Sequence, residues 1–262
     1  MAASAILTVM TNAARKAARG VKRDFGEVEN LQVSLKGPAN YVTKSDQRTE
    51  AVLVEELKKA RPSYGFLMEE GGELKGSDGQ HRWIIDPIDG TTNFIHGIPH
   101  FAISLALERA GVLVAALIYN PITDDLFTAE KGRGAFLDNR RLRVSARRSV
   151  ADAVVACGIP HRGRGEPARF QSEISRIQTR VAGVRRFGAA SLDLAWVAAG
   201  RLDGYWERGL SPWDVAAGIL LVREAGGMVD EIAGGDVFVT GDIVAGNEAV
   251  FEALRQELKA AA

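Results

Sequence analysis

The first part of the chain repeats apolar residues at the spacing of an α-helix. These residues are Ile6, Val9, Met10, Ala13, Ala14 and Ala17. Their spacing predicts an amphipathic helix over about residues 3–23 that packs on the rest of the domain. The same stretch is basic and lacks acidic residues, as in a weak organellar transit peptide. The helical spacing favours the packing helix.

The next elements differ in length and pattern. A second helix is predicted over residues 47–60, because Pro62 ends the pattern. Residues 66–68 form a short apolar run that leads to Glu69 and Glu70. This run predicts a strand whose end carries two carboxylates.

Between residues 101 and 145 the pattern changes to short apolar or alternating runs. The runs cover residues 102–108, 112–119, 126–129 and 135–137. Turn-forming pairs such as Ala110-Gly111 and Asn120-Pro121 separate them. This arrangement predicts an antiparallel sheet.

After residue 146, strands and helices alternate. Strands are predicted at residues 153–158, 184–186, 204–207, 228–230 and 243–246. Helices are predicted at residues 167–179, 189–199, 212–225 and 248–260. The whole pattern predicts a mixed α/β fold with α+β layering, in which an antiparallel-sheet half is followed by a second layered half. We expect one domain over residues 1–262, with an N-terminal half of about 1–145 and a C-terminal half of about 146–262.

Composition narrows the function classes. Hydrophobic residues make up 46% of the chain, charged residues 25%, and the formal net charge is zero. This balance gives no general attraction to nucleic acid or to anionic membranes. The basic run at residues 140–148 lacks interleaved aromatic residues, so a solvated edge is expected there. No apolar run reaches the roughly 20 residues that a membrane span needs.

The chain has one cysteine, Cys157, in an apolar stretch. A single cysteine excludes an intrachain disulfide and suits a reducing cytoplasm. No motif places a base beside it, so we expect a buried structural thiol rather than a nucleophile.

Residues 83–94 carry the strongest chemical signal. Asp86 and Asp89 follow an apolar run, and Pro87 between them cannot donate to a sheet, so the strand is predicted to stop there. Gly90 to Asn93 are predicted to open a helix whose amides attract anions. Hard oxygen ligands beside such a helix suit a divalent metal and phosphate chemistry. Asp-Pro and Asp-Gly are also common turn pairs, and Asp89 alone could be an N-cap.

Further carboxylates occupy similar positions. Ser211 and Pro212 suit the cap and first position of a helix, so a capping box would explain Asp214 without function. The positive end of that helix would also keep Asp214 ionised and ready to bind a metal. Asp46 could in the same way cap the helix at residues 47–60. Because all these carboxylates lie at strand ends or helix starts, where open α/β proteins place ligands, a shared site is favoured.

With these motifs in view, the chain resembles the inositol monophosphatase family of magnesium-dependent, lithium-sensitive phosphatases, and in particular its bacterial members. The matching segments are residues 43–46, 69–70, 83–94, 132–144, 188–207 and 213–227. They are spread over most of the chain, so the resemblance extends over essentially its whole length, and two of them are long signatures in the right order. The resemblance implies a fold in which layers of helices and sheets alternate.

The resemblance implies a site with two to three Mg²⁺ ions. Glu69, Asp86 and the carbonyl of Ile88 would bind the first ion. Asp86, Asp89 and Asp214 would bind the second, with Asp86 shared between the two. A third, weaker ion would lie near Glu69.

The resemblance also implies roles around the phosphate. The amides of Gly90 and Thr91 would hold phosphate oxygens. Thr91, hydrogen-bonded to Asp46, would orient the water that attacks phosphorus, with Glu69 completing the catalytic set. The family further implies a homodimer.

The substrate is the open part of this interpretation. Glu207, Ala190 and Asp193 match a segment that contacts substrate hydroxyls in the family. Met68 and Phe187 are bulkier than the family pattern and are expected to reshape the pocket rim. The leading expectation is hydrolysis of a small polyol phosphate, myo-inositol 1-phosphate, to inositol and phosphate.

Three alternative substrates share the same chemistry: histidinol-phosphate, fructose-1,6-bisphosphate and a 3′-phosphoadenosine nucleotide. A bisphosphate would need cations at the rim, where Arg185 and Arg186 are the nearby candidates. A regulatory binding role on the same scaffold is the alternative of another class. Since every expected metal ligand is present, catalysis is expected in either case.

Overall fold

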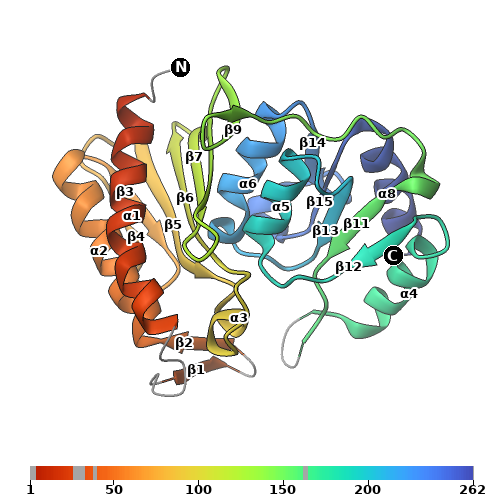
Figure 1. The fold of residues 1–262 in the computed structure, drawn as a ribbon, viewed down its shortest axis with the longest axis horizontal. Helices are drawn as coiled ribbons and strands as arrows, with labels where there is room; N and C mark the ends of the chain where they lie inside the picture. The colour runs from red at the N-terminus through yellow and green to blue at the C-terminus, as the bar shows by residue number, and fades with distance from the viewer. Residues whose placement is uncertain (1–3, 26–32, 38–39, 162–164, 262) are drawn as a thin grey trace.

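The computed structural model describes residues 4–25, 33–37, 40–161 and 165–261. Within these residues, two larger sheets alternate with groups of helices in layers (Figure 1), and a third sheet has only two strands. Helices α1 (Ala5–Phe25) and α2 (Lys44–Ala60) cover the outer face of the larger sheet. Helices α5 (Ala190–Ala198) and α6 (Pro212–Glu224) lie between the sheets, and α4 (Pro167–Ile177) and α8 (Glu248–Ala260) cover the far face of the smaller one. This is the layered α/β fold that the pattern predicts.

The larger sheet has eight strands in the order β10-β9-β8-β7-β6-β5-β3-β4. Its strands are β3 (Gly65–Met68), β4 (Gly72–Leu74), β5 (His81–Asp89), β6 (Ala102–Arg109), β7 (Val112–Asn120), β8 (Asp125–Glu130), β9 (Gly134–Leu137) and β10 (Arg140–Arg141). Strands β5 to β10 pair antiparallel, which confirms the sheet predicted for residues 101–145. The basic run begins on β10, an exposed edge strand, as expected.

Strand β5 differs from the prediction in one respect. It does not stop at the first carboxylate but continues through Asp86 to Asp89. Its pairing with β6 shifts register between these two residues, so Pro87 lies in an irregular stretch of the ladder. A proline is tolerated at such an irregularity because the ladder needs no donor there.

The smaller sheet has five strands in the order β12-β11-β13-β15-β14. They are β11 (Val154–Cys157), β12 (Gly183–Arg185), β13 (Gly204–Glu207), β14 (Met228–Glu231) and β15 (Ile243–Gly246). Strand β11 is parallel to β12 and β13, while β15 is antiparallel to β13 and β14. All five strands and the four helices predicted after residue 146 are present.

Short elements complete the described chain. They are β1 (Val33–Gly37), β2 (Asn40–Thr43), α3 (Thr91–Ile95), the 3₁₀ turn at Val150–Asp152 and α7 (Val237–Thr240). The pattern predicted only α3 among them, because elements of three to five residues leave no clear periodicity. No helix in the described part of the chain combines the length and apolarity of a membrane span.

The N-terminal helix contributes one side to the core. Its buried side includes Met10, Ala13, Ala14 and Val21, which pack with α2 and the outer face of the larger sheet. The predicted amphipathic helix is therefore confirmed, and it extends to Phe25.

The middle helices are apolar on all sides because each touches both sheets or the other helix. Every residue of α6 from Val215 to Val222 is buried. Helix α6 packs closely on α5 at Gly218, where an added Cβ would lie 2.5 Å from the Cβ of Leu194. A glycine is required there because two helix backbones approach each other.

This close approach gives a prediction with an internal control. We expect Gly218→Ala to lower the free energy of unfolding by about 1–3 kcal/mol, because a methyl group overpacks the α5–α6 contact. Gly20→Ala should instead raise it by up to about 1 kcal/mol, since alanine favours the helix and no atom lies within 4 Å of the new Cβ. Urea unfolding followed by circular dichroism measures both changes. Equal stability of the two variants would contradict this account of the middle layer.

Candidate functional site

The site begins where strand β3 ends beside the longer strand β5. Strand β3 pairs in parallel with β5, with Met68 opposite Ile85. The amide of Glu69 donates to the carbonyl of Ile85 at 3.2 Å, which continues the pairing by one residue. Glu69, just past the end of β3, therefore lies beside Asp86 in the last part of β5, near the carboxyl ends of two parallel strands, where α/β proteins place ligands.

The turn from β5 into α3 orders the next groups. The amide of Ile88 donates to Oδ1 of Asp86 at 3.0 Å. The hydroxyl of Thr91 lies 3.0 Å from the carbonyl oxygen of Ile88 and 3.2 Å from Oδ1 of Asp46. The contact between Thr91 and Asp46 that the resemblance implied is thus present. Gly90, with φ of 92°, adopts the left-handed conformation that glycine tolerates best.

Asp46 comes from the first turn of α2, where it has two roles. Its Oδ2 accepts hydrogen bonds from the amide and hydroxyl of Thr43, at 2.8 and 2.5 Å, which closes a capping box. Its Oδ1 faces Thr91. The pKa of Asp46 is raised to about 6. Burial is the largest cause, and the charges of Glu69 and Glu70 add to it, while the hydrogen bonds from Thr43 oppose it.

The other two carboxylates are held by the helices of the middle layer. Oδ2 of Asp89 accepts from the amide of Ser191 at 2.7 Å and also from the Ser191 hydroxyl. Oδ2 of Asp214 accepts from the amide of Ser211 at 2.8 Å at the start of α6. The capping interaction expected for Asp214 is therefore real, and it also fixes the side chain near the other acids.

These carboxylates act on one another electrostatically. Burial raises the pKa of Asp86 well above its usual value. Four neighbouring charges raise it further: Glu69, Asp89, Asp214 and Asp46. Burial, followed by the charge of Asp214, likewise raises the pKa of Asp89. The cluster holds more negative charge than a buried site retains without a cation.

The donor set fits a hard divalent cation, which prefers carboxylate and carbonyl oxygens. Among the described residues, no three His, Cys, Asp or Glu side chains already form a chelating group. Asp86 and Asp89 accept hydrogen bonds from amides and a hydroxyl. Since an ionised carboxylate has about four acceptor positions, these bonds leave acceptor positions for a metal.

Glu50 belongs to this region but was missed from the sequence. Its Oε2 accepts from the amide of Glu70 at 2.9 Å, and the amide of Gly71 also bonds to it. Burial raises the pKa of Glu50, as does the charge of Glu70. It lies one helical turn after Asp46 on the buried side of α2. An acid at a core position of an amphipathic helix was the signal that could have found it.

Asn93 is a second residue whose role was missed. Its side-chain amide donates to the carbonyl oxygens of His100 at 2.7 Å and Phe187 at 2.8 Å. It therefore ties α3 to the segment before β6 and to the segment before α5. Its position inside the motif at residues 83–94 was the available signal.

The residues expected to touch substrate lie on the middle layer and the smaller sheet. Ala190 begins α5, and Glu207 ends β13 and is partly exposed. Asp193 is only 1% exposed, and its Oδ1 lies 3.8 Å from Nε2 of His100. Asp193 is therefore directed into the protein, which does not fit the direct substrate contact expected for it.

The two departures from the family pattern have different positions. Met68 is 3% exposed and packs beneath α1 and α2, so the prediction that it reshapes a pocket rim is wrong. Alternation along β3 turns it inward together with Phe66. Phe187 is partly buried and contacts the rings of His100 and Trp196.

Cys157 is buried in the smaller sheet, as expected. Burial raises the pKa of its thiol to about 12, so the thiol stays protonated near neutral pH. A protonated thiol is a poor nucleophile.

Comparison with known proteins agrees with the geometry. A model of the inositol monophosphatase family matches residues 3–261. The inositol-1-monophosphatase of Rhizobium meliloti (strain 1021) is 59% identical over 260 residues, covering 99% of this chain and 98% of that protein. The Nus factor SuhB of Escherichia coli (strain K12) is 42% identical over 255 residues, covering 97% and 96%.

A solved structure shows the same fold. The extragenic suppressor protein suhB from Bartonella henselae superposes with a TM-score of 0.95 at 56% identity, and the match covers 98% of this chain and 99% of that one. The family match, the relatives and the fold all extend over almost the full length. The chain therefore belongs to the inositol monophosphatase family, and it is a phosphatase.

Proposed function

We propose that this phosphatase hydrolyses myo-inositol 1-phosphate to inositol and phosphate with two to three Mg²⁺ ions. The main support is the cluster of carboxylates at the ends of β3 and β5, with Thr91 bonded between Asp46 and Ile88. Three relatives that are 54–59% identical carry the name inositol-1-monophosphatase. The family as a whole depends on magnesium.

The proposed ligands are those that the family resemblance implies. Glu69, Asp86 and the carbonyl of Ile88 hold the first ion in this proposal, and a third, weaker ion lies near Glu69. Asp86, Asp89 and Asp214 hold the second. When bound, the ions supply Lewis acids that activate water and neutralise charge on the phosphoryl and leaving oxygens.

The chain's own groups orient the reaction. The Thr91 hydroxyl donates a hydrogen bond to Oδ1 of Asp46. This bond leaves the lone pairs of the Thr91 oxygen directed toward the attacking water. The amides of Gly90 and Thr91 hold the phosphate oxygens. Gly90 is suited to this position because a side chain there would approach Phe101 and Ala189 at 3.2 Å.

The leaving alcohol faces the smaller sheet. Glu207, at the end of β13, accepts hydrogen bonds from substrate hydroxyls, and Ala190, at the start of α5, is a small residue that admits the ring. Asp193 is a buried residue of α5, so in this proposal it supports the substrate-facing residues indirectly, through the position of that helix. A carboxylate suits a polyol because adjacent hydroxyls are good donors.

The alternative substrates have less support. Arg185 and Arg186 are exposed, so they remain the candidates to meet a second phosphate group. A regulatory role is suggested only by the relatives named Nus factor SuhB. We further propose one domain, a homodimer and a cytoplasmic location, which the family resemblance and the single buried cysteine support.

A panel of phosphate monoesters tests the substrate. With Mg²⁺ present, we expect the highest kcat/KM for myo-inositol 1-phosphate among the panel, which includes histidinol-phosphate, fructose-1,6-bisphosphate and 3′-phosphoadenosine 5′-phosphate. Excess EDTA should abolish turnover, added Mg²⁺ should restore it, and millimolar Li⁺ should inhibit it. Turnover that persists in EDTA would exclude the metal mechanism, and a better substrate would replace the proposed one.

Asp89 provides a test of the metal site. Asp89→Asn keeps an oxygen for the bonds from Ser191 but removes the negative charge, so the fold should persist. We expect kcat/KM to fall by roughly 100-fold or more, as for disruption of a metal site. Asp152→Asn, at an exposed aspartate, is the matched control and should keep wild-type turnover. Wild-type turnover in Asp89→Asn would contradict the assigned role.

Thr91 provides a test of water orientation. Thr91→Ala removes the hydroxyl and should lower kcat by roughly 100- to 1,000-fold, the range for a positioned proton-transfer group. Thr91→Ser keeps the hydroxyl and should retain most activity. Thr92→Ala, at the exposed neighbour on α3, is the control for local helix damage. If serine and alanine at position 91 lower kcat equally, the hydroxyl does not carry the effect.

A further inference from the structure

Strand β13 presents alternate residues to two different layers. Tyr205 packs in the core that surrounds α5 and α6, whereas Trp206 packs in the core beneath α4 and α8. Because side chains alternate along a strand, Glu207 shares the face of Tyr205. The strand therefore delivers a buried tyrosine and a partly exposed glutamate to the side of the proposed active site.

Tyr205 is bonded directly to Glu207. Its hydroxyl donates to Oε2 of Glu207 at 2.5 Å. The tyrosine is fully buried, and burial, together with the charge of Glu207, raises its pKa well above the usual value. The hydroxyl therefore stays protonated near neutral pH and acts as a donor.

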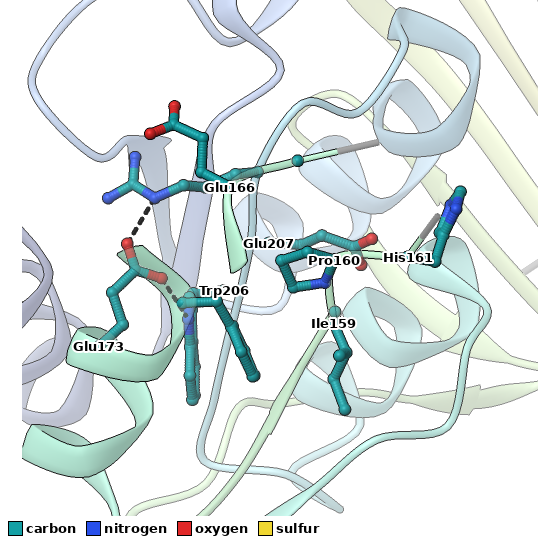
Figure 2. A pocket seen from close by; sticks show the side chains of 11 residues that line it. Ile159, Pro160, His161, Glu166, Glu173, Trp206 and Glu207 are labelled. Atoms are coloured by element: carbon teal, nitrogen blue, oxygen red, sulfur yellow. Dashed lines mark hydrogen bonds and ion pairs between the residues drawn. The ribbon is translucent and has the colours of Figure 1, made fainter. Parts of the chain in front are cut away.

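The Glu207 carboxyl group occupies space that is open because Gly158, next to the end of β11, has no side chain. Gly158 follows β11, and its amide donates to the carbonyl of Trp206 at 3.1 Å. A Cβ at Gly158 would overlap the carboxyl group of Glu207. Figure 2 shows the Glu207 carboxylate in the wall of a small cavity, near Pro160 and directed away from Glu173.

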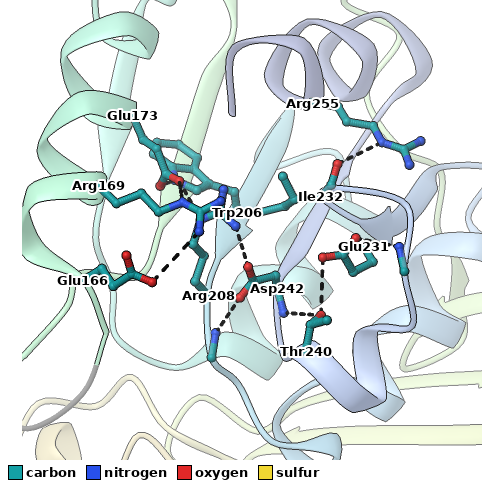
Figure 3. Close-up of polar contacts among 12 residues, drawn as sticks. Glu166, Arg169, Glu173, Trp206, Arg208, Glu231, Ile232, Thr240, Asp242 and Arg255 are labelled. Atoms are coloured by element: carbon teal, nitrogen blue, oxygen red, sulfur yellow. Dashed lines mark hydrogen bonds and ion pairs between the residues drawn. The ribbon is translucent and has the colours of Figure 1, made fainter. Parts of the chain in front are cut away.

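The opposite face of the strand is fixed separately. Nε1 of Trp206 donates to Oε2 of Glu173 at 3.3 Å, and Nε of Arg208 donates to Oε1 of Glu173 at 2.5 Å (Figure 3). Arg208 also pairs with Asp242 at 2.5 Å. The residues on both sides of Glu207 are held by these bonds, independently of the bond between Tyr205 and Glu207.

We propose that Tyr205 is a positioning residue that fixes the Glu207 carboxylate and thereby sets the preference for polyhydroxylated leaving groups. This inference rests on the proposed function. The bond from Tyr205 holds Oε2, which fixes the direction in which the carboxylate meets a substrate hydroxyl. A group held before binding loses less rotamer entropy when the substrate arrives.

The test compares two substrates in one variant. In Tyr205→Phe, we expect kcat/KM for myo-inositol 1-phosphate to fall by about 5- to 20-fold, mainly through KM, since a positioned polar contact is lost. The value for p-nitrophenyl phosphate, whose leaving group has no further hydroxyl, should change by less than about 2-fold. Tyr119→Phe is the matched control, because Tyr119 is also buried and donates to a carboxylate, Asp124, at 2.5 Å.

A double-mutant cycle separates positioning from a general structural effect. If Tyr205 acts through Glu207, Tyr205→Phe should add no loss for myo-inositol 1-phosphate in a Glu207→Gln background. Equal losses for both substrates, or additive losses in the cycle, would overturn the proposal. A wild-type enzyme with Mg²⁺-dependent turnover but no preference for the polyol phosphate would overturn the proposed substrate instead.

Discussion

The main constraint on this structure is the mutual repulsion among carboxylates that the fold gathers at one end of its larger sheet. Parallel pairing of β3 with β5 brings Glu69 beside Asp86, and the capped starts of α2 and α6 add Asp46 and Asp214. Burying ionised groups so close together opposes folding unless a cation offsets their charge. Apolar cores on both faces of the sheet provide the opposing stability. The same repulsion that disfavours the fold creates the affinity for a divalent ion.

Local hydrogen bonds determine where each acid points. Asp46 is held by Thr43 and Asp214 by the amide of Ser211, so ordinary helix caps also orient the site. The proposed role of Tyr205 extends this principle from the metal side to the substrate side. In each case a bond made during folding fixes a rotamer before any ligand binds, which lowers the cost of reaching the reactive geometry.

Much of this arrangement could be predicted from the sequence, because caps and strand ends depend on nearby residues. The capping roles of Asp46 and Asp214 follow from spacing alone. What local patterns could not show is contact between distant segments. The bond from Ser191 to Asp89 joins residues 102 positions apart, and Glu50 meets Glu70 across a helix-to-sheet contact. The inward turn of Met68 and the continuation of β5 past Pro87 likewise depend on neighbouring strands.

The middle layer has a consequence for how catalysis and folding are connected. Helix α5 holds Asp89 through Ser191, while α6 carries Asp214. The positions of these two acids therefore depend on two separate helices. These helices touch at Gly218 and Leu194. A displacement of one helix against the other would change the spacing between Asp89 and Asp214. A substitution in the α5–α6 contact would therefore change turnover together with stability, with the active-site residues left unchanged.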